Sequence, residues 1–116
     1  MSAFRHLTPP VHGLFELLAG LALVIAPFAL SVGPAGLVLS LGFGVLLVGL
    51  ALGAEDGLPV SAHVAFDQAL VIGLAGAAVA LVAVDEGAAA LVLAGVAAFE
   101  LVLTLTTRYA HRALRR

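Results

Sequence analysis

Two short stretches hold most of the ionisable side chains in the apolar part of this chain. The first runs from His12 to Glu16 and the second from His63 to Asp67, and each reads His, two apolar residues, Phe and a carboxylate. A spacing of four residues places the imidazole and the carboxylate of each pair on one face of a helix. Imidazole nitrogen and carboxylate oxygen are suitable ligands for zinc, iron or manganese, and they also hydrogen-bond to each other. The order His-x-x-x-carboxylate differs from the Glu-x-x-His of di-metal helix bundles.

Glu100 is a further carboxylate, near the end of the last apolar segment, and Thr104 and Thr107 share its helix stripe. The leading interpretation of these groups is a hydrogen-bonded polar layer that fixes helix packing, with no cofactor. Alternatives are a bound metal ion, a haem held by His12 and His63, and a proton or ion path. The sequence gives poor support for a path, because no charged group is expected at mid-membrane. The candidate metal ligands are His12, Glu16, His63, Asp67 and Glu100.

The composition indicates a membrane protein. The 116 residues are 63% hydrophobic and 10% charged, with a mean hydropathy of +1.22, whereas soluble domains are about 45–50% apolar and about 25% charged. There is no cysteine, which excludes disulfides and thiolate ligands. No charged block indicates nucleic-acid binding, and no nucleophile elbow, phosphate loop, dinucleotide fingerprint or zincin motif indicates an enzyme. We therefore expect a single, non-enzymatic transmembrane domain over residues 1–116.

Four apolar segments are each long enough to span a bilayer, which takes about 20 helical residues. They predict an all-α fold, a four-helix transmembrane bundle made of two helical hairpins. The expected helices cover about residues 11–31, 35–54, 62–84 and 87–107. The first apolar run is too long for a cleaved signal peptide, and Glu16 interrupts it.

Three local signals refine these helices. Thr8 followed by two prolines predicts the first helix start, with the hydroxyl as its cap. Pro27 predicts a structural kink, because it leaves the carbonyl of Leu23 without an N–H partner. Asp85 is the expected cap of the fourth helix.

The two His-carboxylate stretches also define an internal repeat of one hairpin each, related by an axis along the membrane normal. All five basic residues are arginines in the two terminal segments: Arg5, Arg108, Arg112, Arg115 and Arg116. The positive-inside rule then places both termini in the cytoplasm. The five candidate ligands are expected at one depth near that face. The absence of Lys and the heavy use of Ala, Leu, Val and Gly are typical of a GC-rich bacterial genome, which implies the inner (plasma) membrane.

The stretch from Gly20 to Phe28 resembles the core of the SPW-repeat membrane proteins. Ala26-Pro27-Phe28 stands where that family has Ser-Pro-Trp, and the similarity covers roughly the first 40 residues. The resemblance implies a small bacterial inner-membrane protein of unassigned biochemical role, and it transfers no catalytic residue.

Gly49 and Gly53 have the small-xxx-small spacing that lets helices approach closely in lipid. We therefore expect a structural or accessory subunit that contacts the lipid bilayer and associates with itself or with a larger membrane complex.

Overall fold

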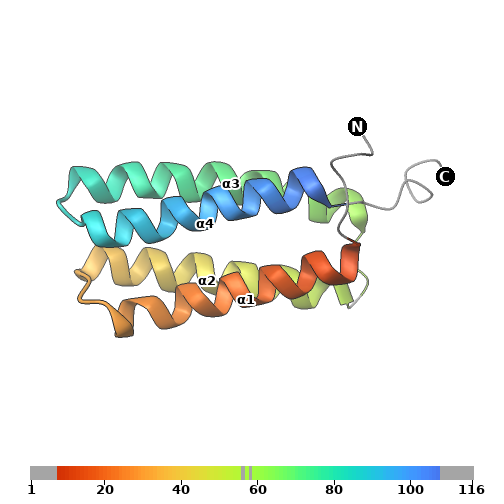
Figure 1. Ribbon diagram of the computed structural model, residues 1–116, viewed down its shortest axis with the longest axis horizontal. Coiled ribbons are helices and arrows are strands. Elements are labelled where there is room, and N and C mark those ends of the chain that lie inside the picture. The colour runs from red at the N-terminus through yellow and green to blue at the C-terminus, as the bar shows by residue number, and fades with distance from the viewer. Residues whose placement is uncertain (1–7, 56, 58, 108–116) are drawn as a thin grey trace.

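The protein is a bundle of four long helices arranged as two hairpins (Figure 1). The computed structural model describes residues 8–55, 57 and 59–107, apart from the side chains at positions 9, 54 and 55. Helix α1 (Pro9–Ala29) packs along α2 (Pro34–Glu55), and α3 (Val60–Ala83) packs along α4 (Gly87–Thr106). The all-α fold and its two hairpins are thus confirmed, with helix ends that differ from the expected ones by a few residues at most.

The first helix begins where the sequence predicts but without the predicted cap. Thr8 takes the N-cap position in an extended conformation, yet its side chain makes no cap hydrogen bond. Pro10, at the second helical position, lacks one of the two N–H groups that such a cap could satisfy. At the other end, α1 continues through Pro27 and stops at Ala29. The arginines used to predict the orientation lie outside the described residues.

The surface of the bundle is apolar and its interior holds the polar groups. Large side chains such as Phe28, Ile72 and Leu91 are 73–77% exposed, whereas His12, Glu16 and Asp67 are at most 1% exposed. Each of the four helices is long and hydrophobic enough to cross a membrane. This distribution suits a hydrocarbon surrounding, so the protein is a multi-pass membrane protein whose helices contact lipid.

The internal repeat appears in the pattern of buried positions. His12, Glu16, Ala19, Leu23 and Pro27 on α1 have the same spacing as His63, Asp67, Leu70, Leu74 and Ala78 on α3. Gly36, Ser40, Gly44, Leu47 and Leu50 on α2 have the same spacing as Ala89, Leu93, Ala97, Glu100 and Leu103 on α4. The two hairpins therefore present equivalent faces to each other, and a residue of one can be compared with its equivalent in the other.

Within the first hairpin the closest approach is between Gly20 of α1 and Gly44 of α2. A Cβ atom on Gly20 would lie 2.9 Å from the Gly44 carbonyl oxygen, and one on Gly44 would lie 2.8 Å from that of Gly20. Only glycine fits at both positions, which is the use of small residues that lets transmembrane helices pack closely.

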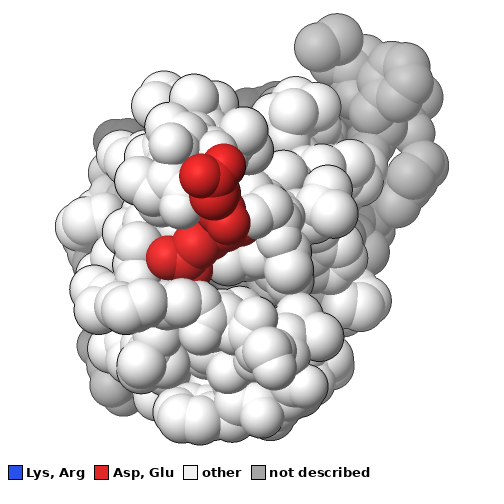
Figure 2. Space-filling model, turned by 90° about the vertical axis from the view of Figure 1, so that its left-hand side faces the viewer, with Lys and Arg blue, Asp and Glu red and all other residues white. Residues whose placement is uncertain are grey.

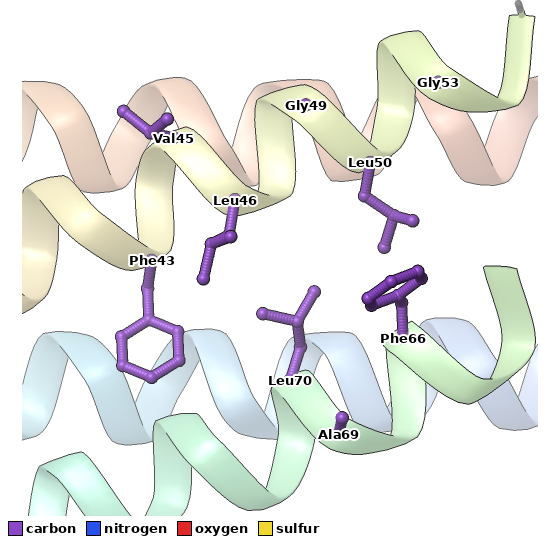
Figure 3. A pocket seen from close by; sticks show the side chains of 9 residues that line it. All are labelled: Phe43, Val45, Leu46, Gly49, Leu50, Gly53, Phe66, Ala69 and Leu70. Atoms are coloured by element: carbon purple, nitrogen blue, oxygen red, sulfur yellow. The ribbon is translucent and has the colours of Figure 1, made fainter. Parts of the chain in front are cut away.

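The Gly49–Gly53 stripe instead faces an apolar groove of about 620 Å³ between α2 and α3 (Figure 3). A Cβ atom on Gly49 would meet nothing within 4 Å. Phe43 and Leu50 of α2 and Phe66 of α3 line the same groove. The stripe therefore does not mediate packing inside this bundle, and its association with a second chain stays a prediction.

At the end of the bundle away from the His-carboxylate pairs, Glu86 joins the two hairpins. Its carboxylate accepts hydrogen bonds from the backbone N–H groups of Ala35 at 3.2 Å and Gly36 at 2.8 Å. Acidic side chains accordingly lie in the middle of an otherwise uncharged end face (Figure 2). The prediction that Asp85 caps α4 is wrong. Glu86 holds the N-cap position, Asp85 adopts a left-handed backbone with φ of 60°, and the cap that forms is made on α2.

Candidate functional site

Four side chains from α1 and α3 meet inside the bundle, and we call them the tetrad: His12, Glu16, His63 and Asp67. One ligand atom from each lies within 4.8 Å of the ligand atoms of the other three. The contacts cross between helices, with His12 Nε2 at 3.0 Å from Asp67 Oδ2 and His63 Nε2 at 2.9 Å from Glu16 Oε1. Within each helix, His12 Nε2 lies 3.3 Å from Glu16 Oε2, and His63 Nε2 lies 3.5 Å from Asp67 Oδ2.

The repeat explains why these four groups meet. In each helix the imidazole and carboxylate are four residues apart and therefore share a face, and in both helices that face is the buried one. Because α1 and α3 are equivalent helices of the two hairpins, their polar starts lie at the same end and face each other. His63 is 7% exposed and the other three side chains are at most 1% exposed. The tetrad is thus closed off from the surroundings of the bundle.

Thr107, immediately after α4, fixes the orientation of the His12 ring. Its hydroxyl donates to the carbonyl oxygen of Leu103 at 2.5 Å. A hydroxyl has one proton, so the Thr107 oxygen accepts the hydrogen bond that joins it to His12 Nδ1. His12 therefore carries a proton on Nδ1 and directs Nε2 at the two carboxylates. In metal sites, a hydrogen bond on the second ring nitrogen performs this same orienting role.

Among the described residues, the environment of the tetrad contains negative groups and no basic side chain besides the two histidines. No Lys or Arg occurs anywhere in the described residues. A neutral His12 with its proton on Nδ1 would point a lone pair at two carboxylate oxygens, which repel it. A positive charge between these atoms removes the repulsion, and either a proton on Nε2 or a metal ion can provide it.

Glu100 approaches the tetrad from α4. It is 1% exposed, and its carboxylate lies against that of Glu16. Neither of its oxygens faces a hydrogen-bond donor among the described residues. It is not one of the four groups whose ligand atoms converge within 4.8 Å. The structure therefore brings Glu100 next to the tetrad, on the side of Glu16.

The distances suit one small cation at the centre of the tetrad. A tetrahedral zinc site with bonds of about 2.0–2.1 Å has ligand atoms about 3.3–3.4 Å apart. The nitrogen–oxygen contacts of 2.9–3.5 Å involve both oxygens of Glu16, and one ligand atom from each side chain lies within 4.8 Å of the other three, so a bound ion would draw the four ligands slightly together. A haem requires two histidines that approach opposite faces of a macrocycle. Here both Nε2 atoms point at the same two carboxylates, and the ring centroids are 5.5 Å apart. The arrangement favours a single ion over a macrocycle.

Two sets of contacts in the site could not be predicted from the sequence. Thr107 is expected on the stripe of Glu100, but its hydrogen bond to His12 depends on how α4 ends beside α1. The cross-pairing of His12 with Asp67 and of His63 with Glu16 depends on the distance between α1 and α3. Spacing within one helix gives only the pairs four residues apart.

No family model matches the chain, and neither a curated protein nor a solved structure matches it significantly. The resemblance to SPW-repeat proteins stays a prediction, and the functional argument depends on the geometry of the site.

Proposed function

We propose that this small membrane protein binds a divalent transition-metal ion in the tetrad. The observation that carries the proposal is the convergence of two imidazole nitrogens on two carboxylates, from two equivalent helices, with nitrogen–oxygen distances of 2.9–3.5 Å. A set of two nitrogen and two oxygen ligands suits zinc, iron or manganese. Its role is binding and not catalysis.

Charge balance supports a divalent ion. The tetrad contributes two carboxylates and two neutral imidazoles, so a divalent cation makes the group neutral. Neutrality matters here because a net charge inside a membrane-spanning bundle costs several kcal/mol. The hydrogen bond from His12 to Thr107 supports the proposal independently, since it leaves Nε2 available as a ligand.

The same proposal includes a location for the site. The tetrad lies at the end of the bundle where α1 begins and α4 ends (Figure 1). With the arginines of both terminal segments in the cytoplasm of a bacterial cell, this is the inner face of the plasma membrane.

Metal content of the protein purified in detergent tests the proposal. We expect about one equivalent of Zn²⁺ per chain after loading and removal of excess metal. The variants Asp67→Asn and His63→Asn keep the side-chain shape and remove a ligand, so each should weaken Zn²⁺ binding by more than about 100-fold. The matched control is Asp85→Asn, which makes the same chemical change as Asp67→Asn at an exposed position at the opposite end of the bundle and should leave binding unchanged.

The competing function is the accessory one, in which the tetrad is only a hydrogen-bonded layer with protons between the imidazoles and carboxylates. That function predicts no metal in the wild-type protein, or equal metal in Asp67→Asn and in the wild type. Either result would reject the binding proposal. Circular dichroism of each variant shows whether a loss of metal accompanies a loss of helix.

A further inference from the structure

Glu100 is the buried position at which the two hairpins differ most in chemistry. Its equivalent on α2 is Leu47, and both side chains are at most 1% exposed. Leu47 shows that an apolar side chain fills this position of the repeat. The packing of the bundle therefore does not explain why the second hairpin has a carboxylate here.

The surroundings of Glu100 do not stabilise its negative charge. Its carboxylate faces that of Glu16, and neither of its oxygens meets a hydrogen-bond donor among the described residues. Glu16 Oε2 lies 3.3 Å from His12 Nε2, on the side of the tetrad. Two buried carboxylates that face each other repel unless a cation or a proton lies between them.

A metal ion in the tetrad does not solve this problem. The ion balances the negative charges of Glu16 and Asp67, and the negative charge of Glu100 remains unbalanced. Glu100 is also outside the group whose ligand atoms converge, so it is not placed to act as a fifth ligand of that ion. The space between Glu16 and Glu100 is a separate position.

We propose that Glu16 and Glu100 hold a second cation beside the metal ion of the tetrad, with Glu16 bridging the two. This inference deepens the proposed function and depends on it. Carboxylate oxygens are the ligands identified at the second position, so it should prefer a hard cation, for which Mn²⁺ is a suitable probe. Two divalent ions and three carboxylates leave one positive charge, which a hydroxide ion formed from metal-bound water would balance. Paired metal ions that share carboxylates typically lie about 3.5–4 Å apart.

Titration of the purified protein with Mn²⁺, followed by electron paramagnetic resonance, tests the second position. We expect about two Mn²⁺ per chain in the wild type and a spectrum broadened by exchange coupling between the two ions. In Glu100→Leu, which copies Leu47, we expect about one Mn²⁺ and the six-line spectrum of an isolated ion. Glu100→Gln serves as a second variant that keeps the side-chain shape, and it should behave in the same way.

The possible results separate the two proposals. One uncoupled Mn²⁺ per chain in both the wild type and the Glu100 variants would reject the second position and leave the tetrad site standing, with a shared proton between Glu16 and Glu100. No Mn²⁺ and no Zn²⁺ in the wild type would reject both proposals. Loss of Mn²⁺ in Glu100→Leu alone, with Glu100→Gln still binding two ions, would show a packing defect and would also overturn the second site.

Discussion

Ser40 of α2 donates a hydrogen bond of 2.5 Å to the backbone carbonyl of Leu23 in α1. This is the carbonyl that Pro27 leaves without its helical partner, because proline has no N–H. In the second hairpin the equivalents of Pro27 and Ser40 are Ala78 and Leu93. The hydroxyl is thus present where proline removes a helical bond, and an apolar side chain is present where the helix is intact.

Replacing Ser40 should therefore be harmful only while Pro27 is present. We expect Ser40→Ala to lower the free energy of unfolding by about 1 kcal/mol, since a buried carbonyl loses its donor. In a Pro27→Ala background, the restored N–H should satisfy the Leu23 carbonyl and reduce the effect of Ser40→Ala to a few tenths of a kcal/mol. Unfolding of the four proteins of this cycle in mixed detergent measures both values. Equal losses in the two backgrounds would show that Ser40 acts by packing alone.

Glu86 should stabilise the bundle by holding the hairpins together at its own end. We expect Glu86→Ala to lower the free energy of unfolding by about 1 kcal/mol, because the Ala35 and Gly36 N–H groups lose their acceptor. Glu86→Gln keeps an acceptor oxygen and should recover part of this loss. The same detergent unfolding assay measures it. If both variants match the wild type, the cap contributes nothing to stability.

A methyl group at Gly36 should displace this cap. A Cβ atom there would lie 2.5 Å from Glu86 Oε1 and 2.7 Å from the Ala89 Cβ. We expect Gly36→Ala to cost about 1–3 kcal/mol of stability, as overpacking does in other cores. Gly42→Ala is the matched control, because its Cβ would meet nothing within 4 Å and alanine favours the helix. A Gly36→Ala protein as stable as Gly42→Ala would contradict the contact.

The sequence predicts those features that depend on one helix at a time. Helix number, hairpin order and the face shared by His12 and Glu16 follow from apolar length and from the period of the helix. Features that depend on the distance between helices do not follow. The spacing of Gly49 and Gly53 predicts a close helix approach there, yet the close approach inside the bundle is made by Gly20 and Gly44. Spacing along one helix does not say which face its neighbour takes.

The same limit explains the error at Asp85. An acidic residue before a helix predicts a cap on that helix, but Glu86 makes its cap on α2, which is remote in sequence. The tetrad is a case in which the sequence does give information about how helices are placed relative to one another. Two copies of one pattern at equivalent helix starts predict a common depth, and the repeat supplies the tertiary information that a single stretch lacks.

The orientation of the protein can be tested with two conservative cysteine substitutions, because the chain has no native cysteine. Ser31 is exposed in the turn between α1 and α2, and Ser61 is exposed at the start of α3, at the opposite end of the bundle. We expect a membrane-impermeant maleimide to label Ser31→Cys in intact cells and to label Ser61→Cys only after the cells are opened. The reverse pattern would place the tetrad at the outer face.

Thr107 should tune the tetrad without contacting the metal ion. Thr107→Val keeps the shape of the side chain and removes the oxygen that accepts from His12 Nδ1. We expect Zn²⁺ affinity to fall by about 10–100-fold, as when other orienting partners of metal-bound histidines are lost. Thr106→Val is the matched control, because the Thr106 hydroxyl donates instead to the carbonyl of Val102 in its own helix, at 2.7 Å. Competition with a chromophoric chelator measures both affinities. Equal affinities in the two variants would mean that Thr107 does not orient His12, and the ring would then have to be held by the carboxylates alone.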